Sequence, residues 1–289
     1  MSTPDPEQYS DHRHHGTVRG LVGPIVVGTI LNVWLFGVML VQIQTYVRNP
    51  SRDPRWIKMI VAFLFLCSTV STVFDCVATY TYSVEKFGHW REIQTATWVL
   101  NADPTMTVLI TSTVQGFFAW RIRRLTGKIW LGILIGAGAF AQFLCGLGTS
   151  IGYGMVQQIV DFQRVKAIII TWLVLAPVTD TMISVALVWY LKRQRTGFAF
   201  TDDIVSKITR LTIQTGAITA LWSALDLAIF LAYPNNLYLI LNMPLSPLYV
   251  NCFMSSLNAR HEWNERPDTQ NGKGDLRGIT VTRTVGVHR

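Results

Sequence analysis

Charged residues are scarce in this chain. Only 15% of its 289 residues are Asp, Glu, Lys or Arg, whereas 50% are hydrophobic. Soluble domains carry about 25% charged residues, so this shortage indicates that lipid is the main solvent. The formal net charge of +8 does not indicate nucleic-acid binding, because the basic residues stand in short clusters between apolar runs rather than on one polar face. We therefore expect a lipid bilayer as partner and no nucleic acid.

Sequence patterns that enzymes and metal sites use are also missing. The four cysteines, Cys67, Cys76, Cys145 and Cys252, lie in apolar runs and form no CxxC pair, which favours buried small side chains over a zinc or redox site. The chain has no glycine-rich phosphate loop, nucleophile elbow or His-Glu-x-x-His motif. The last apolar run has no lysine that could hold retinal. We expect no catalytic activity, no cofactor and no bound metal.

Seven apolar runs are each long enough to cross a bilayer as a helix, which takes roughly 20 residues. They cover about residues 21–46, 57–83, 94–121, 129–153, 166–191, 207–232 and 237–258. The first twenty residues are polar and lack the apolar core of a signal peptide, so we expect the first run to act as the insertion signal. The sequence predicts an all-α polytopic membrane protein with a polar N-terminal tail at 1–20, a seven-helix domain at 21–258 and a polar, disordered tail at 259–289.

Basic residues predict the orientation of these helices. The first, third and fifth loops carry thirteen lysines and arginines, against six on the other side. Basic loops stay in the cytoplasm, so we expect the N-terminus outside and the C-terminus in the cytoplasm. The segment from Arg193 to Arg210 contains a Gly197-Phe198 turn that is a candidate contact for the bundle or for a cytoplasmic protein. The alternative is a capped loop beside anionic headgroups.

Four aspartates lie inside the predicted spans: Asp75, Asp103, Asp180 and Asp226. Helix geometry predicts the first two and Asp226 roughly 9–14 Å below the outer surface, and Asp180 near the middle of the fifth span. No lysine or arginine lies deep in a span, so each carboxyl must be hydrated, protonated, hydrogen-bonded, or matched by a cationic ligand or ion. These aspartates are our candidate ligand-binding residues. The alternative is that they bond to nearby polar side chains and fix helix packing.

Prolines stand beside two of these aspartates. Pro104 follows Asp103 directly, and Pro177 precedes Asp180 by three residues. A proline within a helix leaves one carbonyl without its usual amide partner. Such a carbonyl near a carboxylate could help to bind a cation, or the proline could serve helix shape alone.

Several short motifs are distributed along the chain from about residue 20 to residue 260. They are Gly23-Pro24 with Gly28-Thr29, Gln115-x-Phe117-Phe118-Ala119-x-Arg121, Arg195-Thr196-Gly197-Phe198 with Thr201-Asp202, Thr215-Gly216, Tyr233-Pro234-Asn235-Asn236, and Leu248-Tyr249-Val250-Asn251 through Leu257-Asn258-Ala259-Arg260. With these motifs the chain resembles a large family of seven-helix membrane proteins from basidiomycete fungi that is classed as a domain of unknown function. The resemblance implies a fungal multi-pass membrane protein and brings no activity, ligand or catalytic residue.

Three functions fit these observations. The first is a plasma-membrane or endomembrane protein, receptor-like in layout, that senses a small molecule in an outer-half pocket made by Asp75, Asp103 and Asp226 and passes the change to the basic loops. The second is a small-solute or ion transporter in which Asp180 is the coupling carboxylate at the midplane. The third is a structural or assembly protein without a ligand, in which the aspartates are simply hydrogen-bonded.

Overall fold

The computed structural model describes residues 6–48, 53–87, 97–155, 166–193, 199–233 and 236–264, and all regular structure in these ranges is helical. Seven helices have 20 residues or more. They are α1 (Pro6–Arg48), α2 (Arg55–Tyr80), α4 (Trp98–Thr126), α5 (Ile129–Met155), α6 (Lys166–Arg193), α7 (Ala199–Ala232) and α9 (Leu245–Asn264). A π-helical turn, η1 (Thr81–Glu85), continues α2, and the short η3 (Asn236–Tyr238) and α8 (Leu239–Asn242) precede α9. The predicted all-α class is confirmed.

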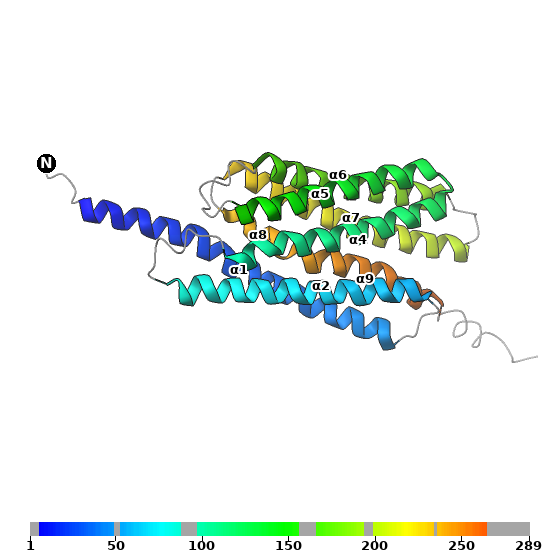
Figure 1. Ribbon diagram of the computed structural model, residues 1–289. Coiled ribbons are helices and arrows are strands. Elements are labelled where there is room, and N and C mark those ends of the chain that lie inside the picture. Colours follow the sequence, from blue (N-terminus) through cyan, green and yellow to red (C-terminus); the bar gives the residue numbers. More distant parts are fainter. Residues whose placement is uncertain are drawn as a thin grey trace, which may run out of the picture.

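The long helices lie side by side in one bundle, with α1 crossing α2 obliquely (Figure 1). Helix α9 lies at the centre, because it packs against α1, α2, α4 and α7. In the most apolar part of the span Asn236–Ala259, which contains most of α9, 83% of the residues are buried. The corresponding share in the other candidate spans is 17–39%. The largest apolar core joins α1, α2, α4 and α9. It includes Phe117 and Phe253, whose ring centroids lie 4.9 Å apart in an edge-to-face arrangement. Helices α5, α6 and α7 cover the other side of α4 and α9.

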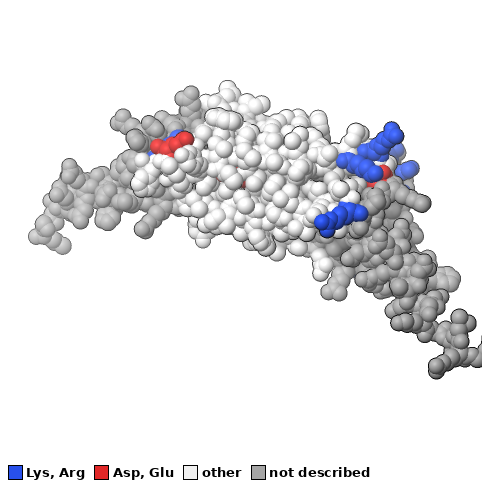
Figure 2. All heavy atoms as spheres, turned by 90° about the horizontal axis from the view of Figure 1, so that it is seen from below, with Lys and Arg blue, Asp and Glu red and all other residues white. Residues whose placement is uncertain are grey.

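Six of the described helical segments are long and apolar enough to cross a membrane. They are Val22–Arg48, Arg55–Glu85, Ile129–Gly152, Lys166–Arg193, Ile213–Ala232 and Asn236–Ala259. Large apolar side chains such as Trp34, Leu66, Ile133 and Leu221 are more than 60% exposed along these helices. Most of the lysines and arginines visible in Figure 2 lie at one end of the bundle, and the surface between the two ends is almost entirely uncharged. This is the surface of an integral membrane protein with several spans.

Helix α4 carries a polar stripe along one face. Asp103, Thr107, Thr111 and Gln115 are spaced four residues apart and are all buried, with exposed fractions of 5% or less. Residues at this spacing share one face of a helix. The polar face of α4 therefore points into the bundle. At 29 residues, α4 is about 44 Å long, which exceeds the roughly 30 Å hydrocarbon thickness of a bilayer.

The observed helix ends differ from the predicted ones at three places. Helix α1 begins at Pro6, inside the segment predicted as a polar tail, and α7 begins at Ala199 rather than near residue 207. The predicted last span, 237–258, is interrupted at Met243 and Pro244, and α9 continues to Asn264. The interruption has a chemical cause, since Pro244 and Pro247 have no amide hydrogen to donate within a helix. The Gly197-Phe198 turn and the tail from 265 onward lie outside the described residues.

Side chains from two other helices hold the interrupted segment. The carbonyl of Met243, whose usual partner would be the amide of residue 247, accepts a hydrogen bond from Asn32 Nδ2 of α1 at 2.8 Å. The carbonyl of Leu241 accepts one from Trp222 Nε1 of α7 at 2.7 Å. A backbone carbonyl buried without a partner is costly in a lipid environment. Both side chains therefore stabilise the break.

Close packing at Gly28 gives a first test of the fold. A Cβ at Gly28 would lie 2.7 Å from the Leu239 carbonyl oxygen and 2.9 Å from Met243 Sδ. We expect Gly28→Ala to lower the free energy of unfolding by about 1–3 kcal/mol, because α1 must move away from the interrupted segment. A Cβ at Gly37 of the same helix meets nothing within 4 Å, so Gly37→Ala is the control. Equal thermal stability of the two variants in detergent would contradict the packing.

Candidate functional site

The four candidate aspartates are all buried in the bundle, with exposed fractions of 0–5%. The hydrogen bonds that reach their carboxyl oxygens come from uncharged side chains: Asn32, Ser71, Gln115, Asn242 and Tyr249. Their hydrogen-bond partners lie on different helices. Asp75 and Asp103 lie near each other on α2 and α4, Asp226 of α7 lies against α8, and Asp180 of α6 faces α4 and α9.

Asp75 is held by the same asparagine that holds the interrupted segment. Asn32 Nδ2 donates to Asp75 Oδ2 at 2.7 Å as well as to the Met243 carbonyl, and its Oδ1 accepts from Thr72 Oγ1 at 2.8 Å. The two amide hydrogens of Asn32 can serve these two acceptors at once. Asn32 itself is fully buried. It therefore joins α1, α2 and the break before α9 in one polar contact.

Asp103 belongs to a neighbouring group of hydroxyls. Ser71 Oγ donates to Asp103 Oδ1 at 2.8 Å, and Ser71 stands one turn before Asp75 on α2. Ser246 Oγ of α9 lies 3.1 Å from Thr107 Oγ1 and 3.3 Å from Ser71 Oγ. The two carboxyls are close enough for their charges to interact. This group links α2, α4 and α9 across the bundle.

Asp226 makes a separate contact. Its Oδ2 accepts from Asn242 Nδ2 at 3.0 Å, and its fully buried Oδ1 has no hydrogen-bond partner. Trp222, which binds the Leu241 carbonyl, stands one turn earlier on α7. Trp222 and Asp226, on one face of α7, therefore both form hydrogen bonds with α8.

Asp180 has the largest set of hydrogen-bond donors of the four. Tyr249 Oη of α9 donates to Oδ2 at 2.7 Å, and Gln115 Nε2 of α4 donates to Oδ1 at 3.0 Å. Thr219 of α7 lines the cavity together with Asp180, and its hydroxyl donates to the Gly216 carbonyl at 3.1 Å. The carbonyl of Asp180 accepts from Ser184 Oγ one turn further along α6 at 2.8 Å. Four helices thus meet at Asp180.

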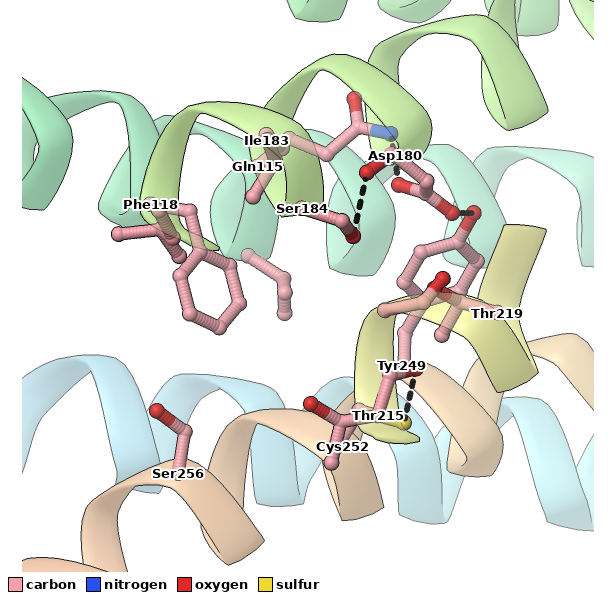
Figure 3. A pocket seen from close by; sticks show the side chains of 13 residues that line it. Gln115, Phe118, Asp180, Ile183, Ser184, Thr215, Thr219, Tyr249, Cys252 and Ser256 are labelled. Atoms are coloured by element: carbon pink, nitrogen blue, oxygen red, sulfur yellow. Dashed lines mark hydrogen bonds between the residues drawn. The ribbon is translucent and has the colours of Figure 1, made fainter. Parts of the chain in front are cut away.

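A cavity of about 40 Å³ adjoins Asp180. It lies between α4, α6, α7 and α9, and is lined by Val114, Gln115, Phe118, Asp180, Ile183, Ser184, Leu187, Thr215, Gly216, Thr219, Tyr249, Cys252 and Ser256. Figure 3 shows Asp180 with Tyr249 and Thr219 at one side, and Phe118 and Ser256 at the other. The second side faces the end where α4, α6 and α9 finish. Asp180 is the one candidate aspartate among the lining residues.

The cavity can hold water or a small ion. One water molecule needs about 10–15 Å³ of cavity volume. A cavity of about 40 Å³ therefore has room for only a few water molecules or small ions. A drug-sized ligand needs roughly 300–1,000 Å³. The walls offer oxygens from a carboxyl, a phenol and hydroxyls, and the buried Oε1 of Gln115 has no hydrogen-bond partner. The described residues contain no group of three or more His, Cys, Asp or Glu that could hold a metal ion.

Part of this region matches a known family. A family of unknown function, DUF6534, matches residues 176–262. The match runs from the middle of α6 to the last turn of α9 and includes Asp180, Asp226 and Tyr249. No curated protein and no solved structure matches the chain. The helices and this partial match together describe a multi-pass helical membrane protein with a domain of unknown function.

The structure gives the four aspartates different hydrogen-bond partners. Asp75 and Asp103 do lie near each other, but Asp226 binds Asn242 on its own, and the described cavity adjoins Asp180. Sequence reasoning did not select Ser71, Thr107 and Ser246, whose hydroxyls surround Asp103. The four-residue spacing from Asp103 to Gln115 was the available signal for this buried polar face. Tyr249 entered only through a family motif, since a tyrosine in an apolar run gives no sign of its partner.

The Asn32 contact gives a second test. Asn32→Ala leaves both Asp75 and the Met243 carbonyl without a donor, so we expect the free energy of unfolding to fall by about 1–3 kcal/mol. Gln44→Ala, at an exposed position of the same helix, should change it by less than about 0.5 kcal/mol. Denaturant unfolding of the purified protein in detergent measures both. The contact has no structural role if Asn32→Ala is as stable as Gln44→Ala.

Proposed function

We propose that the chain is an integral membrane protein with seven spans that carries a proton or a monovalent cation through a site at Asp180. The observation that supports this most is the cavity at Asp180, where a buried carboxyl lines a space large enough for an ion. A single carboxylate matches a single positive charge, and intramembrane carboxyls are characteristic of ion and proton pathways. We assign no catalytic role to any residue.

The proposed seventh span is α4. Its length and its position among α2, α5, α6 and α9 support a full crossing, although its polar stripe lowers its mean hydropathy. A polar face inside the bundle does not meet lipid. With seven spans, the basic loops fall on one side, which we place in the cytoplasm with the C-terminus, and the N-terminus lies outside.

This orientation gives the cavity a direction. The lining residues Phe118, Leu187 and Ser256 lie toward the ends of α4, α6 and α9 that carry the basic clusters. In this conformation the Asp180 site would then be open to the cytoplasm. A carrier with a single site must expose it to each side in turn. The breaks and prolines in α4, α6 and α9 are the places where helices can bend.

Two further parts of the proposal rest on sequence alone. The motifs described above support a fungal seven-helix protein, and we expect it in the plasma membrane. The basic cytoplasmic loops are the expected contact for any cytoplasmic protein partner.

Ion flux tests the role of Asp180. We expect purified protein in liposomes to move protons or a monovalent cation, and Asp180→Asn to reduce the flux at least about tenfold because the charge that attracts the cation is gone. Asp226→Asn is the matched control, since Asp226 is equally buried and does not line the cavity. Flux that persists in Asp180→Asn and disappears in Asp226→Asn would contradict the assignment.

A small-molecule receptor is the second proposal. The observation that favours it is the position of the interrupted segment, which contacts Asp75 through Asn32 and contacts Asp226 through Asn242. A ligand that displaced either contact would shift α8 relative to α9. In that case Asp75→Asn should abolish ligand binding while expression is unchanged, as a radioligand or thermal-shift screen would measure. Unchanged binding would remove Asp75 from the site.

A further inference from the structure

A second hollow lies on the outside of the bundle, between α1 and α2. It has a volume of about 400 Å³, ten times that of the Asp180 cavity. Its walls include Ile43, Tyr46 and Val47 from α1, and Lys58, Val61 and Phe65 from α2. All of them belong to the segments apolar enough to cross a membrane. The hollow, which we call the α1–α2 groove, therefore lies at the lipid boundary of the protein.

The two walls are each one face of a helix. Positions 43, 46 and 47 of α1 follow the spacing of neighbours on one helix face, as do positions 58, 61 and 65 of α2. Tyr46 and Val61 form the buried floor with exposed fractions of 6%, whereas Val47 is 70% exposed at the rim. The groove is thus lined mainly by apolar side chains of two neighbouring helix faces. Its apolar walls favour a lipid over a water-soluble ligand.

One charged side chain, Lys58, lines the groove. It is exposed and stands one turn inside α2 from the exposed Arg55, while the exposed Arg48 ends α1 on the same side. The nearest described acid in the sequence, Asp53, accepts a hydrogen bond from Tyr46 Oη at 3.1 Å. Three basic groups against one acid leave this end of the groove positive. Lysine stems lie along apolar surface while their charged ends reach the headgroup layer.

We propose that the α1–α2 groove binds an acidic phospholipid. One acyl chain lies along Ile43, Val61 and Phe65, and the phosphate and acidic headgroup meet Lys58 with Arg55 beside it. The apolar walls, the groove volume and the positive charge at one end match the two chemically different parts of one such lipid. This site is separate from Asp180, and does not depend on the function proposed for that residue.

The test compares two lipids on the full-length protein. Native mass spectrometry in detergent would titrate a phosphatidylserine and a phosphatidylcholine with identical acyl chains. We expect tighter binding of the phosphatidylserine, and an affinity loss of about fivefold in Lys58→Gln, which is the effect of one basic side chain near an acidic surface. Lys58→Arg should keep the affinity. Ala62→Trp, which fills the groove, should weaken binding of both lipids.

The control is Arg124→Gln, because Arg124 is exposed in the last turn of α4 and does not line the groove. We expect it to leave the affinity for phosphatidylserine unchanged. Equal losses in Lys58→Gln and Arg124→Gln would show diffuse attraction to the basic clusters and overturn the site. Equal affinity of the unaltered protein for the two lipids would overturn it too, as would a protein dimer that forms in place of lipid binding and is broken by Ala62→Trp. If Lys58→Gln does not fold, Ala62→Trp and Lys58→Arg still decide the outcome.

Discussion

The rest of this structure depends on one constraint, which is that buried carboxyls in a lipid-solvated bundle need hydrogen-bond donors from neighbouring helices. Asp75, Asp103 and Asp180 each have such donors, from Asn32, from Ser71, and from Gln115 and Tyr249. Each donor comes from a different helix than the aspartate it binds. Because unpaired polar groups are expensive in lipid, these contacts fix which helices are neighbours.

Helix α4 contributes residues to two of these hydrogen-bonded groups. On its buried polar face, Asp103 and Thr107 are hydrogen-bonded to Ser71 and Ser246. Gln115, three turns beyond Asp103 on the same face, donates to Asp180. Helix α9 runs beside it and supplies Ser246 to the first group and Tyr249 to the second, less than one turn apart. A movement of α9 against α4 would therefore alter both groups. Asn32 and Trp222 hold the interrupted segment directly before α9.

Much of the architecture could be predicted because lipid imposes a simple rule on sequence. The positions of the seven apolar runs, and the aspartates and prolines within them, follow from length and hydropathy alone. The grouping of the aspartates could not be predicted, because helix depth gives height in the membrane but not rotation about the helix axis. Asp226 has the predicted kind of environment but its partner is Asn242. Tyr249 and Thr219, which make the Asp180 site, look like ordinary members of an apolar helix until the fold brings them to a carboxyl.

The break before α9 illustrates the same limit. Pro244 and Pro247 predict a distortion, but nothing in their spacing reveals that Asn32, more than 200 residues earlier, supplies the donor that the Met243 carbonyl lacks. Contacts of this kind arise from helix packing rather than from local sequence. They are also the ones on which the candidate sites depend.

The central claim is that Asp180 can be reached by water from the end of the bundle that carries the basic clusters. Labelling of a cysteine at Ser184, which lines the cavity one turn from Asp180, tests it directly. In a variant without native cysteines, reconstituted in vesicles of known orientation, Ser184→Cys should react with a membrane-impermeant thiol reagent added on the side of the basic loops. Reaction only from the opposite side, or from neither side, would contradict the account.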